Sequence, residues 1–559
     1  MNEDQENDMI QRWVRDTPEE DLKPEDYQHI KTLGSACLTE GNSAQLLTFI
    51  QDEKNQGIVK SMGFVLIEPL VNEVVKKEKS LEHCQAAITH LTRVSKLFIN
   101  HIMRHFFVSS LSSGMTFLLQ LDDRKAACVG LVLSALQKQL TRLPVPYTKQ
   151  LEEADEYGLC RCCTALADFT KSFVQEIKSK NGNYVGTTED EELRTELLKF
   201  CMRSLRELLL DAELSRDRKS SLWLFATEIM VTLPAIQQSL SELLFFNSLK
   251  KSIQMDDCQS KESRACLAYL LFVQLITIES FPAVFSPVFV LQCNMEYINQ
   301  LLSRYAESHL LKGLALYAKS LESVEDNSLP VSLLELQSFY NVPQNLRHIL
   351  TDCPMQHLRA SGLQVFQLFI NKLDSEAKHK FFRCMLKTRN HAGVEGYIIK
   401  NIKNQVEFSM KPGNASKWFL GVEFLSLLGL VLHLSQGAET DLLNSMDRIM
   451  ESLNLLRYLL IRDKELRSRT GVWEELCRIK DDYLKMLRVC ISLSRAYYSA
   501  ELKALKDNQK IKAKDQQTDC VLCRYVSQVL HSALVTFDLM ESLIVRIEEL
   551  TEEKLKIPN

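Results

Sequence analysis

Apolar residues recur at steps of three and four along the last part of the chain. They are Leu522, Val526, Val529, Ala533, Phe537, Met540, Ile544 and Ile547. An α-helix turns about 100° per residue, so this spacing places all of them on one face. The pattern predicts one helix of about 30 residues with a single apolar stripe.

Helix start signals recur along the chain, whereas alternating strand patterns are scarce. Capping boxes occupy residues 17–20 and 188–191, and the second precedes four apolar residues at helical spacing: Leu193, Leu197, Phe200 and Leu208. Residues 281–292 have a β-like composition, but two prolines favour a loop that leads into a helix starting at Ser286-Pro287. These signals predict a mostly helical chain.

Predicted breaks divide the chain into paired helices of about 10 to 25 residues. The breaks are at 143–147, 181–186, 327–330, 411–414 and 503–519. Paired helices without a strict repeat predict an all-α solenoid of degenerate HEAT- or armadillo-like repeats. We divide it into halves, 1–255 and 256–559, with a flexible connector near 503–519. Two separate helical bundles with a boundary near 250–260 are the alternative.

The composition supports a helical chain and gives no sign of nucleic-acid binding. Only 18 glycines and 13 prolines occur among 559 residues, which is typical of helices with short connections. The net charge is −5, and residues 1–30 hold ten acidic residues against three basic ones. No large basic field appears. The lysine-rich run at 503–514 favours a solvated connector, with a nucleic-acid patch as the alternative.

Neither a leader nor a membrane span is expected. The first residues are acidic, unlike a secretory or mitochondrial leader. The most apolar run, 418–434, contains Glu423 and several small residues, which favours a buried helix without membrane insertion. We therefore expect a cytoplasmic protein whose sixteen cysteines are thiols.

Three cysteines, Cys160, Cys162 and Cys163, lie within four residues. On a helix Cys160 and Cys163 point about 60° apart, whereas Cys162 lies on roughly the opposite side. Three ligands that point apart do not close on one ion. The apolar stripe continues through Cys163, so Cys163 and Cys160 are predicted to fill core space, and a metal or redox role is the alternative.

Other candidate chemistry is sparse. Cys520 and Cys523 form a lone C-x-x-C without a second ligand pair, and His101 and His105 stand at i and i+4 without the glutamate of a zinc protease. Phosphate-binding loops, the nucleophile elbow and EF-hand loops are absent from the sequence. We therefore expect no catalytic site, no metal and no cofactor. A thiol- or metal-dependent enzyme that uses these cysteines is the alternative.

Several long strings resemble the glomulin family, in the same order along the chain. They are densest from about 340 to 470 and poor over 1–25, about 210–260 and 500–525. The strings are LPVPYTKQLEEADEYGLCRCC (143–163), LFINKLDSEAKHKFFRCML (368–386), NHAGVEGYIIKNIKNQ (390–405), GAETDLLNSMDRIMESLNLLRYLLIRD (437–463) and LHSALVTFDLMESLIVRIEEL (530–550).

This resemblance implies a HEAT-like solenoid without enzymatic activity. In this family the C-terminal half binds the RING domain of the RING-box subunit of cullin-RING, SCF-type ubiquitin ligases. Binding masks the surface for the ubiquitin-conjugating enzyme and inhibits ubiquitin transfer. The resemblance also implies links to an immunophilin, the hepatocyte growth factor receptor and vascular development, so an adaptor without ligase inhibition is the alternative.

A mask for a shallow apolar patch should present aromatic anchors among polar groups. In the densest region these are Asn401, Lys403, Asn404, Gln405, Trp418, Phe419, Arg457, Tyr458 and Arg462. We expect some of them to converge on the inner side of the solenoid. The alternatives are core packing for Trp418 and Phe419 and a solvated face for the arginines.

Overall fold

The computed structural model describes residues 125–180, 188–215, 217–246, 260–388, 391–462, 472–514 and 521–555. The predicted capping box at 17–20, the histidines His101 and His105, the break at 181–186 and Cys520 lie outside these residues. The helical contacts divide the chain into two units, Met1–Ser320 and Leu321–Asn559. This division differs from the predicted one at 255/256. The described part of the chain has no β-strand, and the predicted all-α helical-repeat fold is confirmed.

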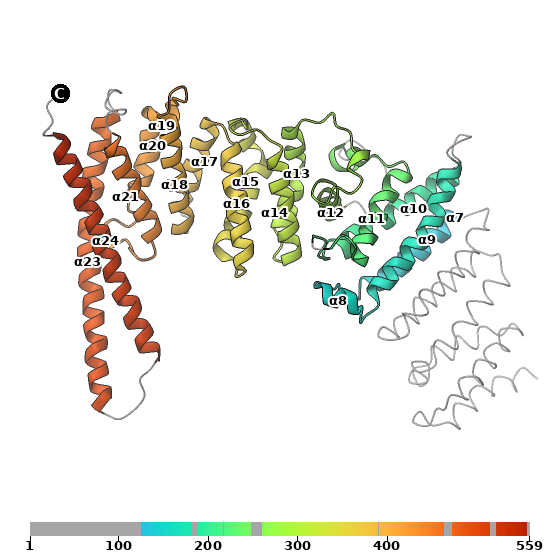
Figure 1. Cartoon of the computed structure of the whole chain (residues 1–559), viewed down its shortest axis with the longest axis horizontal. Coiled ribbons are helices and arrows are strands. Elements are labelled where there is room, and N and C mark those ends of the chain that lie inside the picture. Colours follow the sequence, from blue (N-terminus) through green and yellow to red (C-terminus); the bar gives the residue numbers. More distant parts are fainter. Residues whose placement is uncertain are drawn as a thin grey trace, which may run out of the picture. The chain divides into compact units, whose positions relative to one another are not determined.

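The first unit is built from helices that pack side by side (Figure 1). They are α7 (Lys125–Leu140), α8 (Lys149–Ala154), α9 (Leu159–Lys180), α10 (Thr188–Ser204), the π-helix η3 (Leu205–Leu209), α11 (Ser221–Ala235), the π-helix η4 (Glu242–Phe246), α12 (Lys261–Phe272), the short 3₁₀ helix η6 (Ile278–Ser280), α13 (Pro287–Leu302) and α14 (Glu307–Glu322). The pairs α7–α10, α9–α11 and α12–α13 form its closest contacts.

The predicted loop-to-helix transition at 281–292 is confirmed. Ser286 is the N-cap of α13, its hydroxyl accepts a hydrogen bond from the Phe289 amide, and Pro287 is the first helical residue. Rings from this segment join a half-buried cluster whose neighbouring centroids lie 5.3–6.4 Å apart. The cluster comprises Phe245, Phe246, Phe272, Phe281, Phe285 and Phe289.

A buried lysine joins α14 to the end of η3. The Lys312 ammonium donates to the carbonyl oxygens of Leu210 at 2.9 Å and Ala212 at 2.5 Å, and it lies over the Tyr269 ring. These carbonyls follow a helix end, where backbone acceptors lack partners inside the helix. Burial lowers the pKa of Lys312. This contact connects α14 to the first unit.

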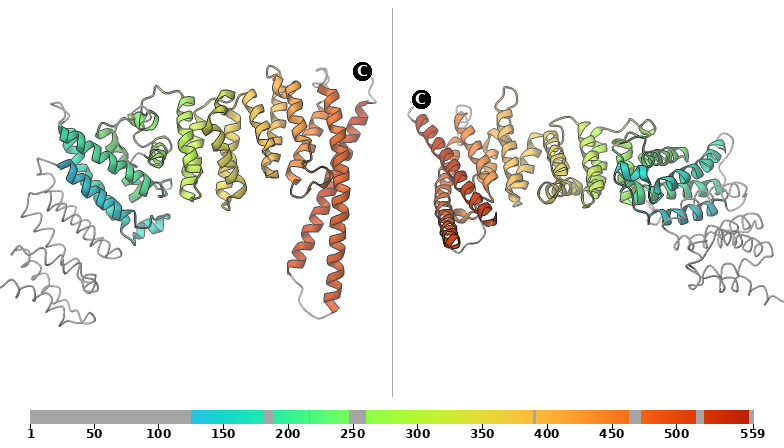
Figure 2. Two further views of the ribbon diagram at one scale, coloured as in Figure 1. Left: turned by 180° about the vertical axis from the view of Figure 1, so that it is seen from behind. Right: turned by 60° about the horizontal axis from the view of Figure 1, so that its bottom comes forward.

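The second unit consists of helical hairpins in two layers. One layer holds α15 (Gln337–Asp352), α17 (Ser375–Lys387), α20 (Val422–Val431) and α23 (Val472–Lys514). The other holds α16 (Gln356–Lys372), α18 (Ala392–Ser409), α21 (Met446–Ile461) and α24 (Val521–Leu555). Shorter elements complete the unit: η7 (Val331–Glu335), α19 (Lys417–Leu420) and η8 (Gly437–Glu439). Figure 2 shows the hairpins from two further sides.

The core of this unit lies between the two layers and between neighbouring helices of the same layer. In α21, Ile449, Leu453, Leu456 and Leu460 are buried, and so are Leu455 and Leu459 on an adjoining face. Both faces are covered because α21 packs against α18 on one side and α24 on the other. Each fully buried leucine contributes about 1.5–3 kcal/mol. The turn after α14 is fixed by backbone hydrogen bonds between Leu329 and residues Lys372 and Asp374.

The last hairpin differs from the predicted connector. Helix α23 continues through the lysine-rich run to Lys514, so the predicted helix break is wrong for 503–514. Lysine, alanine and leucine favour helix, and the run has neither glycine nor proline. At 1.5 Å per residue this helix of 43 residues reaches about 65 Å. With α24 it extends beyond the neighbouring hairpin (Figure 1).

The apolar run 418–434 is only partly buried, since Val422 is 73% exposed, and it forms two helices instead of the single predicted one. Gly421 has extended backbone angles, φ −102° and ψ −166°, between α19 and α20. A Cβ atom at this position would lie 2.6 Å from the Lys417 carbonyl oxygen, so this corner requires glycine. Within the described residues, one segment of α24, Val526–Glu552, is long and apolar enough to cross a membrane. A core helix meets the same criteria, and the predicted stripe of α24 is buried from Ala533 to Ile547. Its earlier members Val526 and Val529 are exposed, so the prediction is wrong for that part of the helix.

Candidate partner-binding surface

Asn401 is buried and holds two helices together. Its side-chain oxygen accepts from Gln367 Nε2 at 2.9 Å, and its amide donates to the Tyr397 carbonyl at 3.0 Å. Tyr397 in turn donates to Gln367 Oε1. With 2% of its surface exposed, Asn401 joins α16 to α18 and does not reach a partner. Its predicted role in the binding surface is wrong in this structure.

Lys403 and Tyr458 are brought together by the packing of α18 on α21. The Lys403 ammonium lies 5.8 Å from the centre of the Tyr458 ring, and both side chains are half-buried. The Tyr458 hydroxyl lies 3.9 Å from the sulfur of Met410, the C-cap of α18. Gln405 is half-buried and Asn404 exposed on the same helix. Lys403 and Tyr458, two residues of the predicted surface, therefore lie together where α18 packs on α21.

Trp418 is half-buried between two nitrogen-bearing side chains. The Lys417 ammonium lies 5.0 Å from the centre of its ring, and the His379 ring lies 5.2 Å away on α17. His379 Nε2 is 3.0 Å from the Glu423 carbonyl oxygen, so we assign the neutral tautomer that donates from Nε2. Burial lowers the pKa of His379, which favours this neutral form.

Phe419, next in the chain, is fully buried against Phe382 and His379. Phe419 therefore belongs to the core, which was the alternative to a place in the binding surface. Its place in the predicted binding surface is therefore withdrawn, whereas Trp418 keeps an exposed part. The short helix α19 begins at Lys417, with Ser416 as its N-cap, and so presents Trp418 at its first turn.

Arg457 and Arg462 are exposed near the end of α21, where Arg462 is the C-cap. Lys400 is exposed in the middle of α18, and Lys411 and Lys417 are exposed in the turn into α19 and at its start. We call the following set the basic edge: Lys400, Lys403, Lys411, Lys417, Trp418, Arg457, Tyr458 and Arg462. Its parts adjoin because α18 packs on both α19 and α21. Figure 1 shows α19 beside the end of α18.

The three clustered cysteines form no reactive site. Cys160, Cys162 and Cys163 are all buried in the first turn of α9, whose amides donate to the carboxylate of Asp155. Burial, reinforced by Asp155, raises the pKa of Cys160 and of Cys162 to about 12. Thiolates are the reactive and metal-binding form. Cys162 was expected on roughly the opposite side of the helix from Cys160, yet both side chains are buried.

The metal alternative finds no support among the described side chains. No group of three histidine, cysteine, aspartate or glutamate residues in the described part of the chain could hold a metal ion. Cys523 lies in α24, its side chain is not described, and its partner Cys520 is outside the described residues.

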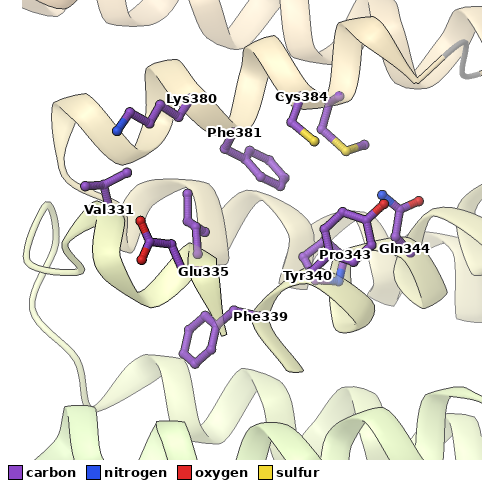
Figure 3. A pocket seen from close by; sticks show the side chains of 11 residues that line it. Val331, Glu335, Phe339, Tyr340, Pro343, Gln344, Lys380, Phe381 and Cys384 are labelled. Carbon is purple, nitrogen blue, oxygen red and sulfur yellow. The ribbon is translucent and has the colours of Figure 1, made fainter. Parts of the chain in front are cut away.

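One hollow of about 220 Å³ lies between η7, α15 and α17 (Figure 3). Its lining is mainly apolar, with Phe339, Tyr340, Pro343 and Phe381, and Cys384 at its rim. Pockets for cofactors and drug-sized ligands measure about 300–1,000 Å³. This hollow is smaller, about the size of one large side chain, and it does not suit a cofactor.

Comparisons with known proteins bear on this arrangement. A family model described as "Uncharacterised protein family, YAP/Alf4/glomulin" matches residues 99–525. Glomulin of Homo sapiens is 41% identical over 570 residues, covering 96% of both chains. The chain belongs to the YAP/Alf4/glomulin family. Glomulin of Mus musculus is also 41% identical, over 574 residues and 96% of both chains.

One solved structure is also similar, a "Circular tandem repeat protein with novel repeat topology and enhanced subunit contact surfaces". It covers 94% of this chain and 97% of its own, at 11% identity and a TM-score of 0.16.

For this member of the glomulin family, sequence reasoning missed three residues of the surface. His379 supports Trp418 from another helix, Met410 contacts Tyr458, and Lys417 covers the Trp418 ring. Lys417 could have been found as the neighbour of Trp418 in sequence. His379 could not, because its contact depends on how α17 packs against α19.

Proposed function

We propose that this protein is a non-enzymatic regulator of cullin-RING, SCF-type ubiquitin ligases. It binds the RING domain of the RING-box subunit and covers the surface that receives the ubiquitin-conjugating enzyme. Ubiquitin transfer then stops, because two proteins compete for one patch. The observation that carries the proposal is the 41% identity to human glomulin over 96% of both chains.

The structure of the second unit supports a binding role. Stacked helical hairpins present a long surface that is suited to holding a small folded domain. The basic edge supplies exposed cations and a half-exposed tryptophan, and aromatic anchors carry much of the energy of protein interfaces. The RING domain has its own zinc, so this chain needs no metal or cofactor for the task. We place the protein in the cytoplasm, without membrane insertion or nucleic-acid partners.

The decisive experiment is a reconstituted ubiquitination reaction with a purified cullin–RING-box complex. The wild-type protein is expected to bind the complex and to stop ubiquitin-chain assembly. Trp418→Ala should weaken binding by about 2 kcal/mol or more, since it removes an anchor. Lys403→Glu and Arg457→Glu should weaken it as well, and each variant is checked for unchanged helicity. A wild-type protein that neither binds nor inhibits would refute the proposal.

An adaptor role is the second candidate, with an immunophilin or the hepatocyte growth factor receptor as partner and without ligase inhibition. It rests on the resemblance alone. The same reaction separates the two, because an adaptor would leave ubiquitin-chain assembly unchanged.

A further inference from the structure

Most cations of the basic edge differ from several other cations of the second unit, which form ion pairs. Five of them form no ion pair with any described residue: Lys400, Lys403, Lys411, Lys417 and Arg457. Elsewhere in this unit Arg448 lies 3.0 Å from Glu395, and Arg495 lies 2.8 Å from Asp538. Neighbouring like charges without ion pairs raise the local positive potential.

Two of these cations are held over aromatic rings. Lys403 covers Tyr458 and Lys417 covers Trp418, at 5.8 and 5.0 Å from the ring centres. A cation over a ring face is attracted by the ring's quadrupole, by about 0.5–1 kcal/mol at exposed sites. Each ammonium is thereby placed beside apolar surface before any partner arrives, so less side-chain freedom is lost on binding.

The Trp418 ring also packs against a side chain of α17. His379 lies against the ring at 5.2 Å and is itself fixed by the hydrogen bond to the Glu423 carbonyl. Trp418 therefore has limited freedom and keeps an exposed part beside the Lys417 ammonium. A half-exposed, oriented indole next to a cation suits an apolar depression bordered by a carboxylate.

We propose that the basic edge recognises an acidic protein surface in which carboxylates surround an apolar centre. The carboxylates pair with Lys403, Lys411, Lys417 and Arg457, while Trp418 enters the apolar centre. Naming the RING domain as the owner of that surface rests on the function proposed above. Recognition of this kind depends on salt, because the Debye length is about 8 Å at physiological ionic strength.

A protein surface fits this edge better than a nucleic acid. Proteins that bind single-stranded nucleic acids stack the bases on open aromatic faces. Here Lys403 and Lys417 already cover a face of Tyr458 and of Trp418.

The test measures association and dissociation rates between the full-length chain and a purified cullin–RING-box complex at several salt concentrations. The edge variant combines Lys403→Glu, Lys417→Glu and Arg457→Glu. The control variant combines Lys485→Glu, Lys503→Glu and Lys506→Glu, which changes the net charge equally at exposed lysines of α23. We expect the edge variant to associate about tenfold more slowly or worse and to lose much of the salt dependence. The control variant should keep most of the wild-type rate.

A second readout identifies the groups in contact. A zero-length carbodiimide joins amines only to carboxylates that touch them. Cross-links from Lys403, Lys411 or Lys417 to partner aspartates or glutamates are expected in the wild-type complex. Trp418→Ala should raise the dissociation rate ~30-fold with a smaller effect on association.

The outcomes separate the two proposals. If wild type and edge variant bind alike, or no edge lysine is cross-linked, the acidic-surface proposal fails while the ligase proposal stands. If the wild type does not bind the complex at all, the ligase proposal fails and its partner assignment with it. Equal or tighter binding of a 20-base-pair DNA duplex, lost in the edge variant, would also overturn the acidic-protein assignment.

Discussion

Lys378 of α17 carries a buried ammonium that donates its hydrogen bond to a neutral side chain. Only 3% of the residue is exposed, and its ammonium donates to the side-chain oxygen of Asn327. Asp326 and Asp374 are near enough to favour the charged form, yet burial outweighs them and lowers the pKa from 10.5 to about 8. The folded protein therefore holds this proton less tightly than the unfolded chain does.

This lowered pKa makes stability depend on pH in a definite direction. Below about pH 8 both states are protonated, and the buried charge lowers stability by about 3 kcal/mol. As pH rises from about 8 to 10.5, the folded state loses the proton first and this penalty disappears. Denaturant unfolding at a series of pH values should show that Lys378→Met loses this rise. Lys380→Met, at an exposed lysine of the same helix, should keep it, and identical pH profiles would contradict the assignment.

Residue identity in the basic edge was only partly predictable. Lys403, Arg457, Tyr458 and Trp418 were found from their residue types and helical spacing. Asn401 and Phe419 were misplaced because their side chains face α16 and α17, and such tertiary contacts leave no linear signal. The contact of His379 with Trp418 was missed for the same reason.

Helices with long regular patterns were predicted well. The stripe of α24 from Ala533 to Ile547, the start of α13 and the turns at 143–147, 327–330 and 411–414 agree with the structure. The predictions failed where a single residue or a local helix propensity outweighed the hydrophobic pattern. Gly421 breaks an otherwise uniform apolar run, and the lysine-rich end of α23 stays helical because helix propensity needs no apolar stripe.

Close contact between α18 and α21 depends on a glycine. A Cβ atom at Gly396 would lie 2.9 Å from the backbone carbonyl oxygen of Asp447, which cannot move independently of α21. Gly396→Ala should therefore push the helices apart and cost about 1–3 kcal/mol of stability. Because Lys403 and Tyr458 meet across the same contact, partner binding should fall too.

The matched control is Gly429→Ala in α20, where no atom lies within 4 Å of the added Cβ. Alanine is the better helix former, so this variant should gain about 0.5–1 kcal/mol. Thermal unfolding of both variants checks the pair. Equal stability changes would show that the tight approach of α18 to α21 does not decide the outcome.

At the scale of the molecule, every residue of the basic edge belongs to the second unit. The contacts that hold Lys312 lie entirely in the first unit. Lys312→Met should leave the carbonyls of Leu210 and Ala212 without this donor and destabilise the first unit by about 1–3 kcal/mol. Partner binding by protein that remains folded should be unchanged.

This prediction is checked by denaturant unfolding followed by hydrogen exchange in peptides from each unit, together with binding to the cullin–RING-box complex. Earlier exchange in α10, α12 and α14 with unchanged protection of α18 and α21 is the expected pattern. Loss of partner binding in the folded fraction would mean that the two units do not act independently.

The contacts of Lys312 also affect its chemistry toward acylating agents. Acetylating enzymes and acyl thioesters need a neutral, accessible amine, whereas this nitrogen is enclosed by two carbonyls and the Tyr269 ring. An acyl group at Lys312 would therefore be added only while α14 is detached, and it would prevent the helix from returning. Acetylation found at Lys312 would therefore mark molecules in which α14 had detached, and it would keep α14 detached.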